Sequence, residues 1–306
     1  MLKEPNHINE HIRVAKYLDQ IFAIFGLLFC FIGLGLILVL LIDLFIDGAS
    51  RLNWRFFTSF PSRFPEQAGI LSAWVGSFAV MFVTAFCAIP LGVGAGIYLE
   101  EYAKKNWLTN LIEINIANLA GIPSIIYGLL ALGLFVYLLD FGESILTGGL
   151  ALGLLILPIG ITATREAIRS VPQSIREASY ACGATKWQTV RHHVLPYSMG
   201  GILTGIIIGL SRAIGETAPL ITVGALTFIA FLPSPPISGE FPFISFKWLF
   251  DSFTVMPVQI FNWISRPQKG FHMNAAAACI VLMVMTLLMN GLAIYIRYRY
   301  RKRIRW

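Results

Sequence analysis

An arginine and a glutamate lie four residues apart in an otherwise apolar stretch. The stretch covers residues 205–229 and reads GIIIGLSRAIGETAPLITVGALTFI, with Arg212 and Glu216 as its charged residues. On a continuous helix, residues four apart share one face, so we expect the two side chains to attract each other. The planar guanidinium also suits bidentate contact to a tetrahedral oxyanion. The pair therefore predicts either an ion pair that joins helices or an anion contact in a membrane pathway.

The same stretch carries signals for a bent helix. Pro219 cannot donate a hydrogen bond to the carbonyl of Gly215 and would crowd it, and a glycine at that position eases a kink. Irregular backbone at membrane depth is tolerated mainly where it lines a cavity or is buried in protein. The charged pair therefore fits a pathway better than a lipid-facing contact. Thr217 has two interpretations, as a contact to the anion or as a cap at the kink.

Composition indicates a protein with several membrane spans. The chain is 57% hydrophobic and 13% charged, with a mean hydropathy of +0.72, whereas a soluble domain has about a quarter of its residues charged. The net charge of +7 does not indicate nucleic acid, because the basic residues lie between apolar runs and at the C-terminus. The cysteines form no close-spaced motif, and we predict no metal or redox site.

Six apolar runs are long enough to span a bilayer, which predicts an all-α membrane protein. We expect a cytoplasmic N-terminal tail at 1–19, a first and peripheral transmembrane helix at 20–46, an outer loop at 47–72, a permease-like core at 73–297 and a basic cytoplasmic tail at 298–306. Within the core, the spans are expected at about 73–99, 111–138, 145–164, 199–230 and 273–297, with a cytoplasmic loop at 165–198 and an outer loop at 231–272.

Lysine and arginine predict the orientation. With the N-terminus in the cytoplasm, 16 of the 23 basic residues lie on the cytoplasmic side, 6 lie in outer loops, and Arg212 alone lies within the membrane. This asymmetry predicts that both termini are cytoplasmic. In the outer loop 231–272, the aromatic sequence FKWLFDSFTVMPVQIFNWI predicts a short helix along the outer interface.

The cytoplasmic loop 165–198 is too polar to span the membrane and too patterned for a linker. Pro172 is suited to the first turn of a helix, and Gly183 can adopt the backbone angles that end it. A second short helix is expected to follow and to stop at Pro196. The prediction is a helix–turn–helix outside the membrane.

This loop resembles the EAA loop of ABC importer permeases. In that family Glu-Ala-Ala is followed after three residues by Gly, and after nine more by an aliphatic residue, any residue and Leu-Pro. The matching residues are Glu177, Ala178, Gly183, Leu195 and Pro196. Two positions depart from the pattern, since Ser179 replaces the second Ala and His193 replaces the aliphatic residue.

The resemblance implies a type I ABC importer permease fold with cytoplasmic coupling helices. The first short helix would dock on a separate ATPase subunit, and the coupling residues would be Glu177, Ala178, Gly183, Ala184 and Trp187. This chain contains no Walker phosphate loop. The expectation is therefore a transport subunit and not an enzyme, with no cofactor of its own and with ATP and Mg on the partner.

Two further strings resemble the permeases of the phosphate ABC importer, and with the loop the resemblance covers most of 69–297. They are SRAIGETAPL around Arg212 and AGIPSIIYGLLALGLFV at 120–136. This implies alternating-access import of phosphate across the bacterial cytoplasmic membrane. The partners implied are a second homologous permease, a homodimeric ATPase and an extracytoplasmic phosphate-binding protein. Ser124 and Tyr127 either line the path or pack helices together.

Glu216 raises a question of selectivity, because a carboxylate repels an anion. Phosphate near neutral pH keeps a proton that the carboxylate can accept in a hydrogen bond, whereas sulfate has none. We therefore hypothesise that Glu216 moderates Arg212 and penalises sulfate.

Three alternative functions remain at this point. The first is import of another oxyanion of the sulfate or molybdate class. The second is a stand-alone secondary transporter or channel, which would need no coupling loop. The third is an intramembrane enzyme, which would need a histidine near Glu216, and His272 at a span boundary is the nearest to qualify.

Overall fold

The computed structural model describes residues 6–236 and 245–303, and the regular structure in these ranges is entirely helical. Parts of the predicted N-terminal tail, outer loop 231–272 and basic tail lie outside the described residues. The elements, including short 3-10 and π turns written as η, are α1 (Asn6–Gly48), η1 (Ala49–Arg51), α2 (Trp54–Thr58), α3 (Leu71–Ile97), η2 (Tyr98–Tyr102), α4 (Trp107–Leu119), α5 (Ser124–Ala131), η3 (Leu132–Leu138), α6 (Ile145–Arg169), α7 (Gln173–Ala181), α8 (Lys186–Thr189), η4 (Val190–Val194), α9 (Leu195–Ile214), α10 (Ala218–Thr222), η5 (Lys247–Phe250), α11 (Met256–Ile264) and α12 (Lys269–Arg303).

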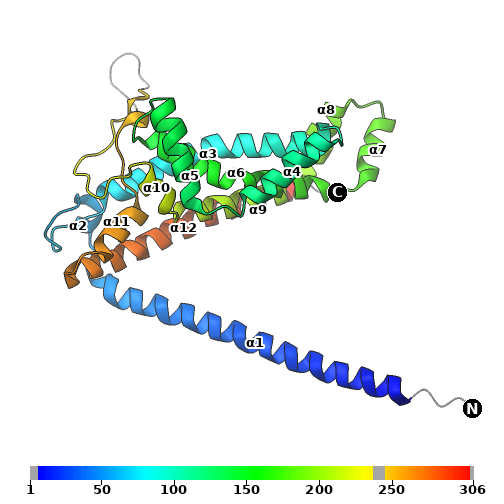
Figure 1. Cartoon of the computed structure of the whole chain (residues 1–306), viewed down its shortest axis with the longest axis horizontal. Coiled ribbons are helices and arrows are strands. Elements are labelled where there is room, and N and C mark those ends of the chain that lie inside the picture. The colour runs from blue at the N-terminus through cyan, green and yellow to red at the C-terminus, as the bar shows by residue number, and fades with distance from the viewer. Residues whose placement is uncertain (1–5, 237–244, 304–306) are drawn as a thin grey trace, which may run out of the picture.

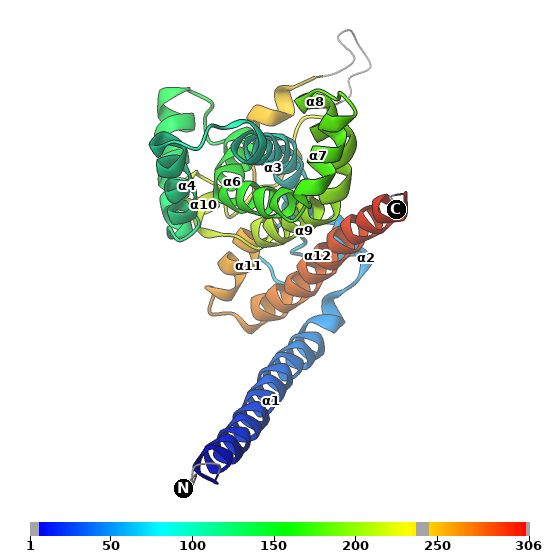
Figure 2. The same ribbon diagram turned by 90° about the vertical axis from the view of Figure 1, so that its right-hand side faces the viewer.

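Helices α3, α6 and α9 lie side by side at the centre of the molecule (Figure 1 and Figure 2). Small residues allow them to approach closely: a Cβ on Gly92 of α3 would lie 3.5 Å from the Cα of Gly160 of α6. Two turns further along α6, a Cβ on Gly201 of α9 would lie 2.7 Å from the Cβ of Ala167. Within lipid, such close packing drives helix association, so the small residues explain why these helices form the core.

Helix α1 extends away from this core (Figure 1). It contacts α12 near its C-terminal end, where a Cβ on Gly48 would lie 2.7 Å from the backbone nitrogen of Ala277. The span Ile12–Arg51 has a hydropathy of 3.0 and 0% of its most apolar window is buried. Its apolar surface is therefore uncovered in the single chain.

Within the described residues, five helices are long and apolar enough to cross a membrane, and there are six if one bent pair of helices is counted as a single span. The predicted third span, 111–138, is that pair: α4 and α5 meet at an angle of 109°. The predicted third span is therefore a broken pair of helices and not one continuous helix. Pro123 adopts an extended conformation, with φ −54° and ψ 135°, and proline also pushes its preceding residue out of helical geometry.

The predicted fifth span, 199–230, is not one helix either. Helix α9 ends at Ile214, and α10 begins at Ala218 with Pro219 in its first turn. The backbone beyond Thr222 is irregular as far as residue 230. The expected kink is thus a complete helix break.

The segment 165–198 differs from the expected helix–turn–helix at its second half. Helix α7 and the turn are present, but the helix that begins at Lys186 does not stop at Pro196 and runs without interruption to Ile214. The π turn η4 comes immediately before Leu195 and Pro196. A π turn shifts the register of the backbone hydrogen bonds, so the missing N–H of proline is accommodated there.

The outer aromatic segment forms the short helix α11 at 256–264, as expected. Trp263 and Met256 are fully buried, and the Trp263 ring centroid lies 6.1 Å from that of Phe56 and 6.5 Å from that of Phe271. Helix α11 is therefore part of a second hydrophobic core against α12. Phe261 and Ile264 of the same helix are exposed.

Candidate functional site

The short helices that follow the two breaks pack against each other. Gly128 of α5 faces Pro219 and Thr222 of α10, and a Cβ on Gly128 would lie 2.6 Å from the Cα of Pro219. A larger residue at position 128 would separate the two helices. This contact brings the breaks at 120–123 and 215–217 into one region of the molecule.

Arg212 and Glu216 do not share a helix face, because α9 ends between them at Ile214. The backbone N–H of Glu216 donates to the carbonyl of Ala213 at 3.2 Å, which closes the last turn. Within the described residues, the Arg212 side chain is exposed and forms no ion pair with Glu216. The predicted pairing is therefore wrong, since the helix stops at Gly215 and does not merely bend.

Tyr127 is buried, and its hydroxyl donates to the carbonyl of Leu119 at 2.7 Å. This hydrogen bond joins the end of α4 to α5 across the break. Tyr127 thus has a structural role that the sequence left open.

Ser124 is the first residue after the α4–α5 break, and Thr217 is the last residue of the α9–α10 break. Ser124 begins α5 and is half-buried. Thr217 precedes α10, and its side chain makes no capping hydrogen bond there, so the capping role considered for it is not observed. Ser124 lies on α5 together with Tyr127, and Thr217 lies between α9, which carries Arg212, and α10.

One face of α9 is uncovered. Ile202, Gly205 and Ala213 are buried against the core, whereas Ile208 and Arg212 are exposed. Arg212 therefore lies on the exposed face of α9, at the edge of the bundle in the single chain. Across residues 6–236 and 245–303, no three His, Cys, Asp or Glu side chains gather around a possible metal position.

The predicted coupling residues lie at the opposite end of α9. Glu177 and Ala178 are exposed on α7, and Trp187 is exposed on α8. Gly183 has φ +80°, as expected for the turn between the helices, and Ala184 follows it. The structure does not bring these residues near Arg212, so any communication between the two sites passes along the helices.

Ser179, which departs from the family pattern, joins the two helices of this loop. It is buried, and its hydroxyl lies 2.9 Å from that of Thr189 on α8. The side chain of Thr185 caps α8 in a reciprocal arrangement with Gln188. The loop is therefore an ordered unit.

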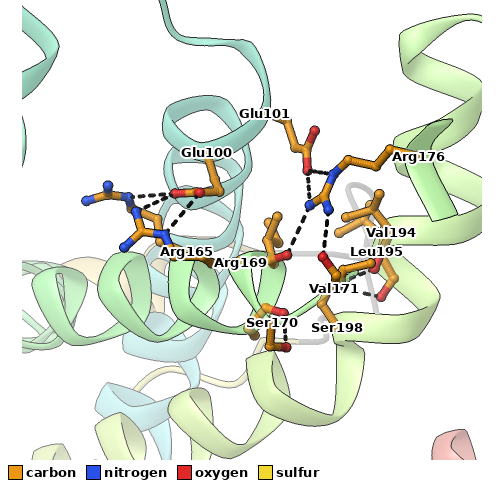
Figure 3. Close-up of polar contacts among 12 residues, drawn as sticks. Glu100, Glu101, Arg165, Arg169, Ser170, Val171, Arg176, Val194, Leu195 and Ser198 are labelled. Atoms are coloured by element: carbon orange, nitrogen blue, oxygen red, sulfur yellow. Dashed lines mark hydrogen bonds and ion pairs between the residues drawn. The ribbon is translucent and has the colours of Figure 1, made fainter. Parts of the chain in front are cut away.

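The sequence analysis missed an ionic network beside this loop (Figure 3). Arg165 of α6 pairs with Glu113 of α4 at 2.7 Å, and Arg169 pairs with Glu100 of η2 at 2.9 Å. In addition, Arg176 of α7 pairs with Glu101 of η2 at 2.7 Å. The adjacent glutamates near the end of the second apolar run were the available signal, but their partners lie far away in the chain.

Comparison with known proteins agrees with this arrangement. Residues 88–305 match the family model of the binding-protein-dependent transport system inner membrane component. The chain is 38% identical over 197 residues to the probable ABC transporter permease protein YqgI of Bacillus subtilis, covering 63% of this chain and 67% of that protein. It is 32% identical over 298 residues to the phosphate transport system permease protein PstA of Yersinia pestis, covering 95% and 89% of the two chains.

A solved structure supports the fold. A bacterial ABC transporter involved in the import of the acidic polysaccharide alginate matches with a TM-score of 0.60 and 13% identity, covering 94% of this chain and 99% of that chain. At this level of identity, the likeness concerns the arrangement of helices alone.

Proposed function

This chain belongs to the family of binding-protein-dependent transport system inner membrane components, and we propose that it is the PstA-type permease subunit of an ATP-driven phosphate importer. It is a multi-pass transport subunit and not an enzyme. Both the phosphate permease among its relatives and the chemistry of Arg212 support phosphate as the substrate.

The observation that carries the substrate proposal is the exposed guanidinium of Arg212, which has no carboxylate partner within the described residues. A charged side chain in a span is costly unless it faces a partner, a cavity or water. An arginine whose guanidinium N–H groups have no carboxylate partner can donate to two oxygens of one phosphate. Tyr127, Ser124 and Thr217 lie on the adjoining broken helices and would border the same path.

A second homologous permease, of the PstC type, would cover the uncovered face of α9. Ile208 and Arg212 share that exposed face, so the path would run between two subunits and not through one. The uncovered surface of α1 is consistent with such a partner or with lipid. Alternating access would then consist of the two subunits rocking about this shared surface.

The ATPase partner, a homodimer of the PstB type, would dock on the exposed surface of α7. Glu177 and Ala178 are free for such a contact, and Gly183 fixes the corner of the loop. ATP and Mg would be bound by that partner, because the chain carries no Walker phosphate loop. An extracytoplasmic phosphate-binding protein of the PstS type would deliver the substrate to the opposite face, with both termini of this chain in the cytoplasm.

The test is phosphate uptake by proteoliposomes that contain this chain, its homologous permease and the ATPase, with the binding protein outside. We expect uptake to require ATP and all four proteins. Arg212→Gln should abolish uptake while the subunits still co-purify. Arg13→Gln, which removes an exposed arginine near the start of α1, serves as the matched control and should transport normally.

Other outcomes would reject specific parts of the proposal. ATP-independent uptake by this chain alone would establish a stand-alone transporter. Sulfate uptake in place of phosphate uptake would change the substrate. Failure of Arg212→Gln to assemble would assign Arg212 a structural role, and normal transport by this variant would remove it from the path.

A further inference from the structure

The π turn η2 lies between the end of α3 and the coupling loop. Its sequence, YLEEY, places two adjacent carboxylates on different partners (Figure 3). Glu100 accepts from Arg169 of α6, at 3.2 Å from Nε and 2.9 Å from Nη2. Glu101 accepts from Arg176 of α7, at 3.0 Å from Nε and 2.7 Å from Nη2. One short segment therefore connects the core helix α6 and the exposed helix α7.

Arg176 joins three elements through one guanidinium. Besides Glu101, it donates to the carbonyl of Val171 at 2.8 Å and to that of Ile168, in the last turn of α6, at 3.1 Å. The side chains of Arg176 and Glu101 are 12% and 7% exposed. A buried, charge-assisted and multiply bonded pair of this kind holds its partners in one geometry.

The other side of the loop contacts the same turn. The ammonium of Lys186, at the start of α8, lies 5.2 Å from the centre of the Tyr102 ring, which is within the range of a cation–π contact. The Ser179–Thr189 contact joins α7 to α8. Both helices that flank the Gly183 turn are thus attached to η2, by Arg176 and by Lys186.

We propose that η2 transmits movement of the coupling loop to α3, in addition to the covalent connections from the loop to α6 and α9. Glu101 and Arg176 lie 75 residues apart in the chain, and their ion pair ties α7 to the turn that continues α3, beside the apolar cluster in which Ile97 and Ile175 pack. A π turn is a frequent site of local adjustment in a helix. Glu101 is accordingly a positioning residue for coupling, a role that rests on the proposed docking of an ATPase at α7.

The test compares variants in the complete four-protein transporter in proteoliposomes and measures phosphate imported per ATP hydrolysed. Glu101→Gln should lower this ratio by about fivefold or more, while the ATPase still co-purifies and hydrolyses ATP. Glu101→Asp keeps the charge and should retain part of the coupling. The matched control is Glu166→Gln, since the Glu166 side chain is 71% exposed and makes a single contact of 3.4 Å; its ratio should equal that of the wild type.

If Glu101→Gln fails to assemble, two variants of Tyr102 test whether η2 transmits the movement. Tyr102→Phe keeps the ring under Lys186 and should couple normally, whereas Tyr102→Leu removes it and should lower the ratio. An unchanged ratio in Glu101→Gln, or a proportional loss of transport and ATP hydrolysis, would overturn the proposal. If Glu101→Gln does not assemble, an unchanged ratio of phosphate imported per ATP hydrolysed in Tyr102→Leu would also overturn the proposal. Absence of ATP-dependent phosphate uptake by the wild type would instead reject the proposed function.

Discussion

Gly128 packs directly against Pro219, with room for no side chain between the two backbones. This contact packs α5, which follows the α4–α5 break and carries Tyr127, against α10, which follows the α9–α10 break. The candidate path therefore depends on a glycine that carries no functional group of its own.

Gly128→Val should destabilise the subunit by about 1–3 kcal/mol, because a side chain would force α5 away from α10. Transport should fall with stability. Gly133→Val is the control, since no atom lies within 4 Å of a Cβ at Gly133. Thermal unfolding of the detergent-solubilised transporter, together with phosphate uptake, measures both effects. Equal unfolding temperatures for the two variants would contradict the packing argument.

Glu216→Gln should preserve phosphate transport and weaken the rejection of sulfate. The carboxylate can accept the phosphate proton but repels a fully ionised anion, and the amide no longer repels it. Competition of sulfate with labelled phosphate uptake is the measurement. If sulfate competes no better than in the wild type, Glu216 has no role in selectivity.

Gly183→Ala should strain the turn of the coupling loop by about 1–2 kcal/mol, because φ is +80° at this position and an L-residue is disfavoured there. We expect weaker co-purification of the ATPase and reduced ATP-dependent uptake. Gly200→Ala, in the regular helix α9 with open space around it, should leave both unchanged. Normal ATPase binding by Gly183→Ala would show that the loop tolerates a different corner.

Cys182 provides a test of orientation. It is exposed at the end of α7, whereas Cys87 and Cys279 are half-buried in spans and Cys30 lies in the apolar helix α1. A membrane-impermeant maleimide should label inverted vesicles at Cys182 and should not label right-side-out vesicles. Cys182→Ser should remove the label. Labelling from the outer side would reverse the predicted topology.

Local sequence patterns were sufficient for the class of protein and for most of the spans. Apolar runs of about 20 residues are long enough to cross a bilayer, and the EAA-like spacing lies within one continuous segment. The position of the Gly183 turn was predictable for the same reason. The sequence also singled out Arg212 as a candidate pathway residue, since it is the basic residue left at membrane depth in the predicted topology.

Only the tertiary structure decided which partners these residues have. Whether Gly215 and Pro219 bend α9 or end it depends on the packing of α10 against Gly128, which lies far away in the chain. Arg212 and Glu216 are close in sequence but separated by that helix end. In contrast, Glu101 and Arg176 are 75 residues apart and share a buried ion pair. Spacing specifies neighbours along one helix, whereas contacts between helices exist only once the bundle has packed.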